Sequence, residues 1–570
     1  MATARFKIAA GLLVLTALVS AGCGDDKSAS PGTTAPSGTV SAGTTASTTT
    51  TLAPKDGGSL THGVFSETAG LDPAVTFGGG ATGTTEVGAI FDTIMRYDTD
   101  KKTYVPQIAE SLTSNAAFSE WTLKLRPNVK FTDGTDFDSD AVVFGMKRHV
   151  QYGSRAAALV AGIKDYTVVD KLTLKFTLTA PYSNFPYVLS FTPGMIPSPT
   201  AVKAACKIGQ PDEIKLMTQC PFNLNPVGAG PYMIDKFLPK ESITLKRNAA
   251  YWGGKPHLDT IKFVTVGSSQ TVLEGLKSGT LQMGYMREPE PGKKAAEDPT
   301  LGTYLNLVWA GNGLVLNNDK VNCRGGLPAA VCAGKPDGIV ELDTPTKDLR
   351  VRQAISFAID PKVIDQRAQN STGYPGGSFF QAGSKWKSSA PVNTYDVEQA
   401  KKLVQTVKAE GKWDGTVRLN CSVSQANMAI AVQTLLQAAG FTVNLNNGQE
   451  TAGQINTITN QKQFDVGCWG FSMADEAPEV IFSLAFNAAA AGNSMNHQIT
   501  DIDAQSKLMR EAKTDADKQA ALDKIQDIWR AQVPSVITGA TPERIVWRKT
   551  VHGVTPNVAS TILWHNVWVE

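Results

Sequence analysis

The chain has 570 residues, of which 42% are hydrophobic and 19% charged, with a formal net charge of +2. This near-neutral balance gives no reason to propose nucleic acid as a partner, because proteins that bind nucleic acid carry strongly basic surfaces. The length exceeds what one ordinary core supports and predicts two or three domains.

Residues 1–22 are typical of an export signal. Arg5 and Lys7 form a basic start, residues 8–19 are an apolar run, and small residues precede Cys23. The run is too short to span a bilayer, which needs about 20 residues, so it predicts a signal peptide. The small residues resemble a lipobox, which implies cleavage and lipidation at Cys23. Ordinary secretion without a lipid remains the alternative.

Residues 23–55 are predicted to be a disordered tether. Residues 27–54 are almost entirely Ser, Thr, Gly, Ala and Pro, so there is little to bury. A flexible tether would let a body anchored at Cys23 move above the membrane.

Six further cysteines in an exported chain predict disulfides rather than a metal site. No CxxC motif occurs and the six histidines are scattered without ligand spacing, so we expect no metal and no cofactor. Six cysteines allow 15 pairings. Because closure of short loops favours neighbours, the favoured pairs are Cys206–Cys220, Cys323–Cys332 and, by remainder, Cys421–Cys468.

The first half of the body is predicted to be rich in strands. Residues 57–64 open it as a strand, and apolar residues at helical spacing predict a helix over 86–96. Residues 121–125 alternate strictly and predict a half-buried strand, followed by a helix that Asp138 or Ser139 caps. Two short strands follow at 166–169 and 172–178. The proline-rich and aromatic passage at 181–199 predicts loops rather than a helix interior.

Residues 226–264 predict a glycine turn followed by three strands. Val227-Gly228-Ala229-Gly230-Pro231 indicates a tight turn in which glycine reaches positive φ. The predicted strands cover 232–237, 242–246 and 258–264, and a polar turn with Tyr251 and Trp252 precedes the last one.

The second half alternates between helices and strands. The predicted helices cover 270–278, 349–360 (closed by Pro361), 396–410 (with a capping box of Asp396 and Gln399), 428–439, 502–512 and 515–532. The predicted strands cover 281–286, 417–423, 441–444 and 464–470, and strands and turns at 544–570 return to the first lobe. This alternation indicates a mixed or parallel sheet flanked by helices, an α/β class.

Several motifs together resemble one known family. Residues 226–264 carry G-A-G-P-Y and then R-N-x-x-Y-W-G-G-K-P-x-L-D. Four further motifs are GGSL, LDPA, residues 106–148 (PQIAESL to FGMKR) and RVRQAISFAID. They resemble the family 5 extracellular solute-binding proteins, which feed peptides, nickel or related solutes to ABC importers. The resemblance covers about residues 57–570.

The resemblance implies a periplasmic-binding-protein type II fold (cluster C) with two lobes and an extra subdomain in the first. The expected boundaries are a first-lobe core at 56–90, 227–313 and 540–570, an extra subdomain at 91–226, and a second lobe at 314–539.

The implied function is capture of a solute, with peptides favoured, by closure of the lobes and delivery to an ABC permease. The chain is expected to be a monomer on the outer face of the cell membrane, lipid-anchored at Cys23, and not an enzyme, since no GxSxG, HExxH or P-loop motif occurs. A binder of a nonpeptide solute such as a sugar, metal chelate or haem, and a surface sensor or adhesion lipoprotein, remain alternatives.

The segment 464–478 is expected to decide the class of ligand. In peptide binders of this family an aspartate four residues before a proline pairs with the ligand's amino terminus, and an aromatic lies three residues earlier. Counting back from Pro478 places Ala474 and Phe471 at these positions, with Asp475 and Trp469 nearby. Either a local bulge restores Asp475 as the anchor, or the anchor is missing.

Further candidates for ligand contact lie at strand ends and in glycine loops. Together with Trp469, Phe471 and Asp475, the predicted ligand-binding residues are Phe77, Gly80, Tyr285, Arg287, Trp309, Asn312, Tyr374, Phe379 and Asn493. For each, a structural role in the core or in a turn is the alternative.

Overall fold

The computed structural model describes residues 52–570, except 77, 78, 82, 155, 324–329, 336, 337 and 491. The body forms one compact unit, Pro54–Glu570. The predicted signal peptide, Cys23, most of the tether and Phe77 lie outside the described residues.

Across the described part of the chain, no helix combines the length and the apolar character needed to cross a membrane.

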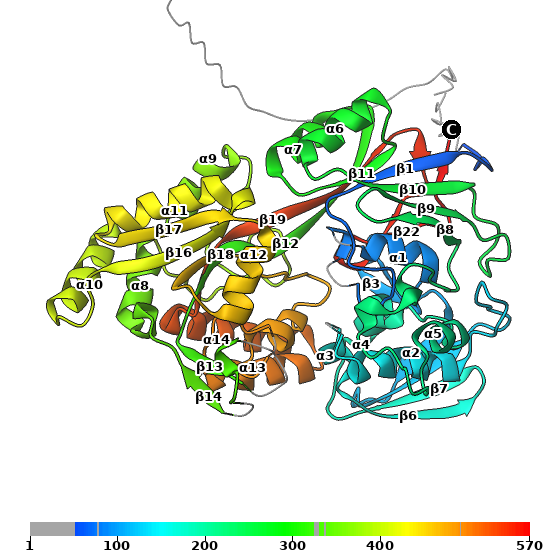
Figure 1. The fold of residues 1–570 in the computed structure, drawn as a ribbon, viewed down its shortest axis with the longest axis horizontal. Coiled ribbons are helices and arrows are strands. Elements are labelled where there is room, and N and C mark those ends of the chain that lie inside the picture. Colours follow the sequence, from blue (N-terminus) through cyan, green and yellow to red (C-terminus); the bar gives the residue numbers. More distant parts are fainter. Residues whose placement is uncertain are drawn as a thin grey trace, which may run out of the picture. The chain divides into compact units, whose positions relative to one another are not determined.

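One 11-stranded sheet runs through both lobes (Figure 1). Its order is β17-β16-β18-β12-β19-β11-β1-β10-β9-β8, and β15 pairs with β19. The first-lobe strands are β1 (Ser59–Val64), β8 (Tyr232–Leu238), β9 (Ser242–Arg247), β10 (Thr260–Thr265) and β11 (Met283–Met286). The second-lobe strands are β15 (Tyr374–Pro375), β16 (Thr416–Ser422), β17 (Thr442–Gln449) and β18 (Val466–Trp469).

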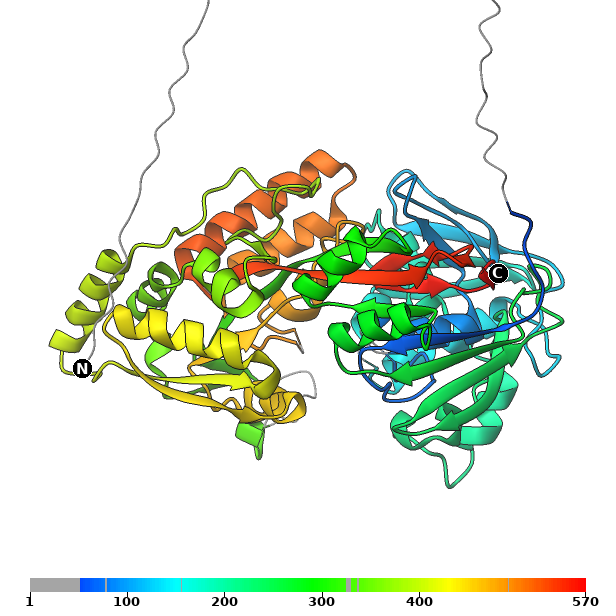
Figure 2. The ribbon, with the colours of Figure 1, turned by 90° about the horizontal axis from the view of Figure 1, so that it is seen from above.

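Two long strands, β12 (Leu301–Leu316) and β19 (Ser535–Arg548), connect the lobes (Figure 2). They pair antiparallel on both sides of an irregularity between Val308 and Gly313, where the register shifts. Ala310 lies at the break with φ of 51°. The expected lobe boundaries at 313 and 539 lie inside these strands, so continuous backbone joins the lobes.

The rest of the first lobe covers the sheet and adds a second one. A four-stranded antiparallel sheet has the order β4-β5-β7-β6. Its strands are β4 (Ala109–Ser114), β5 (Glu120–Leu125), β6 (Ile163–Asp170) and β7 (Thr173–Leu178). The first-lobe helices are α1 (Thr84–Phe91), α2 (Ser139–Gln151), α3 (Ala157–Val160), α4 (Phe185–Ser190), α5 (Pro199–Cys206), α6 (Ser269–Ser278) and α7 (Pro289–Glu297). The short strands are β2 (Met95–Asp98), β3 (Thr103–Pro106), β20 (Val551–His552), β21 (Thr555–Pro556), β22 (Ile562–Leu563) and β23 (Trp568–Val569).

The second lobe packs helices around parallel strands. β16 pairs in parallel with β17 and with β18. The helices are α8 (Leu349–Ala358), α9 (Pro361–Gln369), α10 (Val397–Ala409), α11 (Ala426–Ala438), α12 (Thr451–Ile455), α13 (Thr500–Glu511) and α14 (Asp515–Gln532). A small hairpin pairs β13 (Lys320–Asn322) with β14 (Ile339–Glu341).

Three sequence predictions about helices need correction. The helix predicted over 86–96 ends at Phe91, because Asp92 takes a positive φ of 59° that a helix cannot continue. The passage predicted as loops contains α4, with Pro186 in the first turn, where its missing N–H costs no helical bond. The helix predicted over 349–360 ends at Ala358, and Pro361 begins a further helix, α9, which Asp360 caps.

The glycines of the 227–231 turn serve close packing rather than positive φ. Neither Gly228 nor Gly230 has a positive φ. A Cβ on Gly228 would lie 2.3 Å from the carbonyl oxygen of Ile90, and the Gly230 N–H donates to the same oxygen at 2.8 Å. The glycines lie where the sequence predicts them to be needed. They are needed for close packing against Ile90, however, and not for a positive φ.

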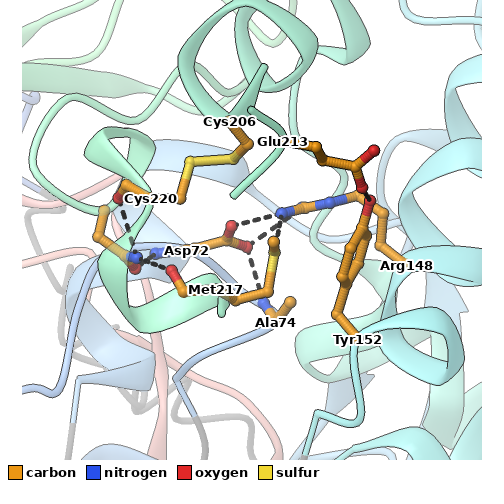
Figure 3. Close-up of a disulfide and its surroundings, with 9 residues drawn as sticks. Asp72, Ala74, Arg148, Tyr152, Cys206, Glu213, Met217 and Cys220 are labelled. Carbon is orange, nitrogen blue, oxygen red and sulfur yellow. Dashed lines mark hydrogen bonds and ion pairs between the residues drawn. A yellow bond between two sulfur atoms is a disulfide. The ribbon is translucent and has the colours of Figure 1, made fainter. Parts of the chain in front are cut away.

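The three disulfides are Cys206–Cys220, Cys323–Cys332 and Cys421–Cys468, the pairing favoured by the sequence. The first of them lies beside a buried ion pair between Arg148 and Asp72 (Figure 3). The Arg148 guanidinium donates to both carboxylate oxygens of Asp72, at 2.6 and 3.2 Å. The two side chains are 2% and 0% exposed. The LDPA motif and the end of the 106–148 motif thus meet in the core.

Arg148→Met is expected to destabilise the fold by about 3–5 kcal/mol, because it leaves the Asp72 carboxylate buried and unpaired. The measurement is chemical denaturation at pH 7. Lys130→Met is the control, since the Lys130–Asp136 pair is more than half exposed and is worth at most about 1 kcal/mol. Equal losses in the two variants would contradict the prediction.

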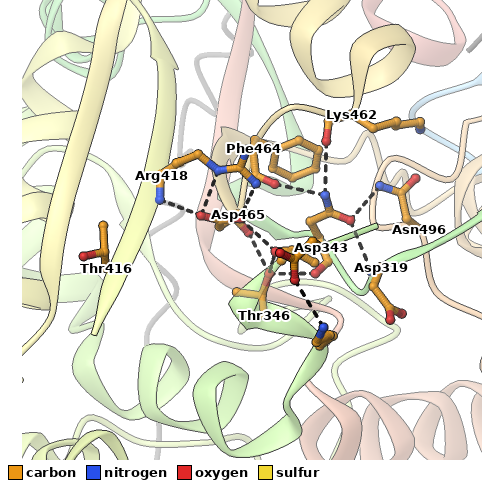
Figure 4. A network of polar contacts seen from close by, with 12 residues as sticks. Asp319, Asp343, Thr346, Thr416, Arg418, Lys462, Phe464, Asp465 and Asn496 are labelled. Atoms are coloured by element: carbon orange, nitrogen blue, oxygen red, sulfur yellow. Dashed lines mark hydrogen bonds and ion pairs between the residues drawn. The ribbon is translucent and has the colours of Figure 1, made fainter. Parts of the chain in front are cut away.

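A polar network fixes the second-lobe end of β12 (Figure 4). The Arg418 side chain and backbone N–H donate to the buried Asp465 carboxylate, which also accepts from the Thr344 hydroxyl. The Asn317 side chain donates to the carbonyl oxygen of Phe464 at 2.9 Å. The network therefore joins β12, β16 and β18 on the second-lobe side of the irregularity.

Glu86 in α1 is buried, and neither carboxylate oxygen has a hydrogen-bond partner among the described residues. Burial raises the pKa of Glu86 to about 7. A folded-state pKa above the unfolded value means that the native state keeps a proton that the unfolded state has lost. The contribution of Glu86 to stability is therefore lost as pH rises from about 4.5 through about 7.

Glu86→Gln should consequently gain stability over the original chain as pH rises, by up to about 3 kcal/mol at pH 8. Denaturation curves at pH 5, 6, 7 and 8 measure the gap between the two proteins. The exposed Glu241→Gln variant should show no such trend. A gap for Glu86→Gln that is independent of pH would refute the assignment.

Candidate binding cleft

A cavity of about 860 Å³ is lined by residues from both lobes. The first lobe contributes Phe65, residues 287–291 and residues 541–542. The second lobe contributes residues of α9 and β15, residues 422–428, residues of α12, and residues 468–470. β12 and β19 add Asn312, Thr538 and Gly539. We refer to this cavity as the cleft.

The cleft lies at the carboxyl ends of parallel strands, which explains its position. Phe65 follows β1 and Arg287 follows β11, and these two strands are parallel. In the second lobe, Val423 follows β16 and Gly470 follows β18, which are also parallel. Side chains after such strands meet at one edge of a sheet, where α/β proteins bind ligands.

Polar side chains line this space, and two of the lining residues have hydroxyls without a hydrogen-bond partner among the described residues. Thr538 and Thr541 line the cleft, and their buried hydroxyls have no partner among the described residues. The side chains of Gln425, Asn427 and Gln454 also line it. A buried polar atom without a partner is costly, so a polar solute that supplies partners is suited to the space.

The charged lining residues are Arg287, Glu288, Glu290 and Asp365. The Arg287 guanidinium lies 5.1 Å from the ring centroid of Phe65, a cation–π contact. A Glu288 oxygen accepts from the Ser269 N–H at 2.6 Å, and an Asp365 oxygen accepts from the Gly373 N–H at 2.8 Å.

Across the described part of the chain, no group of three or more His, Cys, Asp or Glu side chains is placed to hold a metal ion.

Of the predicted ligand-binding residues, Arg287, Asn312, Tyr374 and Trp469 line the cleft. Asn312 donates to the Ala540 carbonyl oxygen at 3.0 Å, and Tyr374 begins β15, which pairs with β19. Trp469 ends β18 and pairs with Gly313. The strands that join the lobes thus hold three of these four residues.

The other aromatic candidates lie in the core. Tyr285, Trp309, Phe379 and Phe471 are each less than 5% exposed. Phe379 packs edge-on against Trp529 with ring centroids 4.9 Å apart. Their side chains hold the cleft walls in place and do not line it.

The remaining described candidates have structural partners. Asn493 donates to the carbonyl oxygens of Ala488 and His497. A Cβ on Gly80 would lie 2.1 Å from the carbonyl oxygen of Ser560, so glycine permits this close approach.

Asp475 does not line the cleft. Its carboxylate accepts from the Ser384 hydroxyl at 2.5 Å, and its backbone carbonyl accepts from the Trp386 indole at 2.8 Å. Burial raises the pKa of Asp475, against the effect of the hydrogen bonds from Ser384 and Trp309. The bridge between Trp309 and Met473 fixes the preceding backbone. The first alternative required a local bulge that brings Asp475 to the ligand. In this arrangement Asp475 does not reach the cleft, which favours the second alternative, a missing amino-terminal anchor.

Sequence reasoning missed Phe65 and the residues of 422–428 that line the cleft. The signal that could have found them was the parallel β-α-β pattern itself. Phe65 follows the strand predicted at 57–64, and residues 422–428 cover the end of the strand predicted at 417–423 and the residues after it. The rule for carboxyl ends of parallel strands would therefore have placed them at the site.

Direct contacts between the lobes in the described part of the chain include the following hydrogen bonds. The Asn370 amide of the second lobe donates to the Glu290 carboxylate of the first at 2.9 Å. The Asn184 amide of the first lobe donates to the Glu476 carbonyl oxygen at 2.9 Å and to the Glu479 carboxylate at 2.8 Å. Glu479 is also paired with Lys518 at 3.0 Å, and both side chains are buried. The structure therefore represents lobes held together around the cleft.

Asn184→Ala should favour separation of the lobes, because it removes two hydrogen bonds between them, each worth about 1 kcal/mol. Small-angle scattering of the ligand-free protein should show a larger radius of gyration than for the original chain. Gln151→Ala, an exposed amide in the same subdomain, should leave the profile unchanged. An unchanged profile for Asn184→Ala would show that this contact does not hold the lobes together.

Comparison with known proteins gives a consistent family. Residues 103–493 match the family described as "Bacterial extracellular solute-binding proteins, family 5 Middle". The Periplasmic oligopeptide-binding protein OppA of Salmonella typhimurium is 25% identical over 473 residues, 73% of this chain and 78% of that protein. The Nickel-binding periplasmic protein of Escherichia coli (strain K12) is 23% identical over 323 residues, 55% of each chain, so the match spans about half its length.

Solved structures share the fold. The structure of AgaA in complex with agropinic acid, from A. tumefacien R10, aligns with a TM-score of 0.72 and 23% identity, covering 90% of this chain and 99% of that one. The mixed α/β, two-lobed type II binding-protein fold expected from the sequence is confirmed.

Proposed function

Because this chain belongs to the bacterial extracellular solute-binding proteins of family 5, whose members deliver solutes to ABC transporters, we propose that it captures peptides in the cleft. The observation that carries the proposal is a cavity of about 860 Å³ lined by both lobes at the carboxyl ends of parallel strands. A volume of this size is suited to a small solute.

Closure of the lobes supplies the affinity. The irregularity of β12 at 308–313 is the place where the lobes turn, since pairing with β19 is regular on both sides of it. Closure removes water from the solute and strengthens its polar contacts in the lower dielectric. The closed form then presents the permease with a surface that the open form lacks.

The proposed ligand contacts are Arg287, Asn312, Tyr374 and Trp469, which line the cleft. The protein would act as a monomer without cofactor or catalysis, outside the cytoplasm, held to the membrane by a lipid on Cys23.

A nonpeptide solute is the second candidate, and the position of Asp475 favours it. The Asp475 carboxylate, which a local bulge would have had to bring into the anchor position, is hydrogen-bonded to Ser384 away from the cleft lining. AgaA, which shares the fold, was solved with agropinic acid.

Mass spectrometry of solutes released by denaturing the purified protein distinguishes the two candidates. Release of a mixture of peptides supports capture of peptides. Release of a single nonpeptide compound supports capture of a nonpeptide solute instead. Release of no solute, together with no heat on titration with peptides or agropinic acid, would overturn solute capture.

Trp469→Ala should weaken binding of the released solute about tenfold or more, because the large apolar indole lines the cleft and would be buried against the solute. Isothermal titration of the desalted protein measures the change. Trp413→Ala is the control, since Trp413 packs against Phe441 away from the cleft. Equal affinities in Trp469→Ala and in the original chain would remove Trp469 from the site.

Anchoring is tested by expression of the full chain and of Cys23→Ser. The original should fractionate with membranes and the variant with the soluble fraction. Soluble fractionation of both would support ordinary secretion instead.

A further inference from the structure

We infer that Arg287 is the anchor for a carboxylate of the bound solute, and that the cleft therefore selects small solutes that carry a carboxylate. The inference rests on the proposed capture of a solute in the cleft and adds the chemical class of that solute. The carboxylate belongs either to the carboxyl terminus of a peptide or to an acidic sugar derivative such as agropinic acid. These share the group that Arg287 would recognise.

The geometry presents the guanidinium for this contact. Arg287 is the first residue after β11, and Phe65 is the first after β1, so both stand at the same edge of the sheet. The guanidinium carbon lies 5.1 Å from the centroid of the Phe65 ring, which in turn packs edge-on against Tyr285 at 6.4 Å. This cation–π contact uses no N–H group of the guanidinium as a hydrogen-bond donor to the protein, so these groups remain for a bidentate acceptor.

The backbone that carries Arg287 is held in place. The N–H groups of Arg287 and Glu288 both donate to the Ser269 hydroxyl, at 3.0 and 3.1 Å. The Glu288 carboxylate accepts from the N–H of Ser269, the first residue of α6, at 2.6 Å. One oxygen of the neighbouring Glu288 carboxylate is thereby hydrogen-bonded to the backbone. The Arg287 backbone is positioned before a solute arrives, which limits the entropy lost on binding.

Arg287 is the charged lining residue whose side chain has no hydrogen bond or ion pair within the described part of the chain. It is the one Lys, Arg or His among the described lining residues. Each acid of the lining has a partner: Glu288 with Ser269, Glu290 with Lys294 and Asn370, and Asp365 with Gly373. No ion pair joins Arg287 to any residue in the described part of the chain.

A half-buried cation without a counter-charge is satisfied by an anion that enters with the solute. Closure of the lobes removes water from this cation, and a charge that loses water needs an opposite charge and hydrogen bonds. A carboxylate supplies both at once. The carboxylate of Asp475, by contrast, lies outside the cleft lining and does not offer a partner for an amino terminus. The cleft is therefore better suited to bind a carboxylate than an ammonium group.

The test uses four proteins and three probes in isothermal titration after removal of co-purified solute. The proteins are the original chain, Arg287→Gln, Arg287→Lys, and the control Arg367→Gln, which removes the same charge from an exposed position on α9 outside the cleft lining. The probes are trialanine, trialanine carboxamide and agropinic acid. The carboxamide replaces the terminal carboxylate of trialanine by a neutral amide of similar size.

The expected result is that trialanine, agropinic acid or both bind the original chain and Arg367→Gln with equal affinity. Arg287→Gln should lose about 10- to 100-fold in affinity for the same acid, and Arg287→Lys an intermediate amount, because an ammonium keeps the charge but not the two-pronged geometry. The carboxamide should bind at least tenfold more weakly than trialanine where trialanine binds. Binding of trialanine identifies a peptide carboxyl terminus as the source of the carboxylate, and binding of agropinic acid identifies an acidic sugar derivative.

Two results would overturn the inference and leave solute capture intact: equal binding of trialanine and its carboxamide, or unchanged affinity of Arg287→Gln for an acid that binds. Failure of all three probes to bind the original chain overturns the inference as stated. If in that case the denatured protein still releases an uncharged or cationic solute, the capture function stands without the anion anchor.

Discussion

The pairing of β12 with β19, interrupted at one point, is the constraint on which the rest of the structure depends. Regular pairing on either side makes each half of the ribbon part of its own lobe. Between them, the backbone of Trp309 leaves β19 and exchanges hydrogen bonds with Met473, and the Ala310 carbonyl accepts from the Phe471 N–H. The break is thus tied to the second lobe, and the proposed bending there would move the lobes while the regular pairing on both sides stays intact.

The same ribbon explains where the cleft lies and what lines it. Parallel strands approach the ribbon from both lobes, and their carboxyl ends supply Phe65, Arg287 and Trp469. Behind these residues, buried pairs such as Arg148–Asp72 and the network around Asp465 fix each lobe as a rigid unit. Among the described residues, hydrogen bonds between the lobes join Glu290 to Asn370, and they join Tyr104, Tyr182, Ser183 and Asn184 to residues 476, 479 and 512.

Much of the fold could be predicted because its local patterns agree with its tertiary structure. The alternation of 121–125 matches β5, whose Trp121, Leu123 and Leu125 are buried, and the apolar face of 349–360 matches α8. The prediction failed where tertiary context decides the backbone, as at the end of α1 and in α4. The site was harder to predict from the sequence. Phe379 is buried because it packs against Trp529, which is remote in sequence, and Asp475 lies outside the cleft because it is hydrogen-bonded to Ser384.

The central claim is that the two lobes close around a solute by bending at 308–313. Pulsed electron spin resonance between labels at Lys293 on α7 and Ile430 on α11 tests it directly, since both positions are exposed and lie in different lobes. With the solute that the purified protein releases, the account predicts one narrow, short distance, and without it a second, longer distance. A single distribution that is identical in both conditions would contradict it.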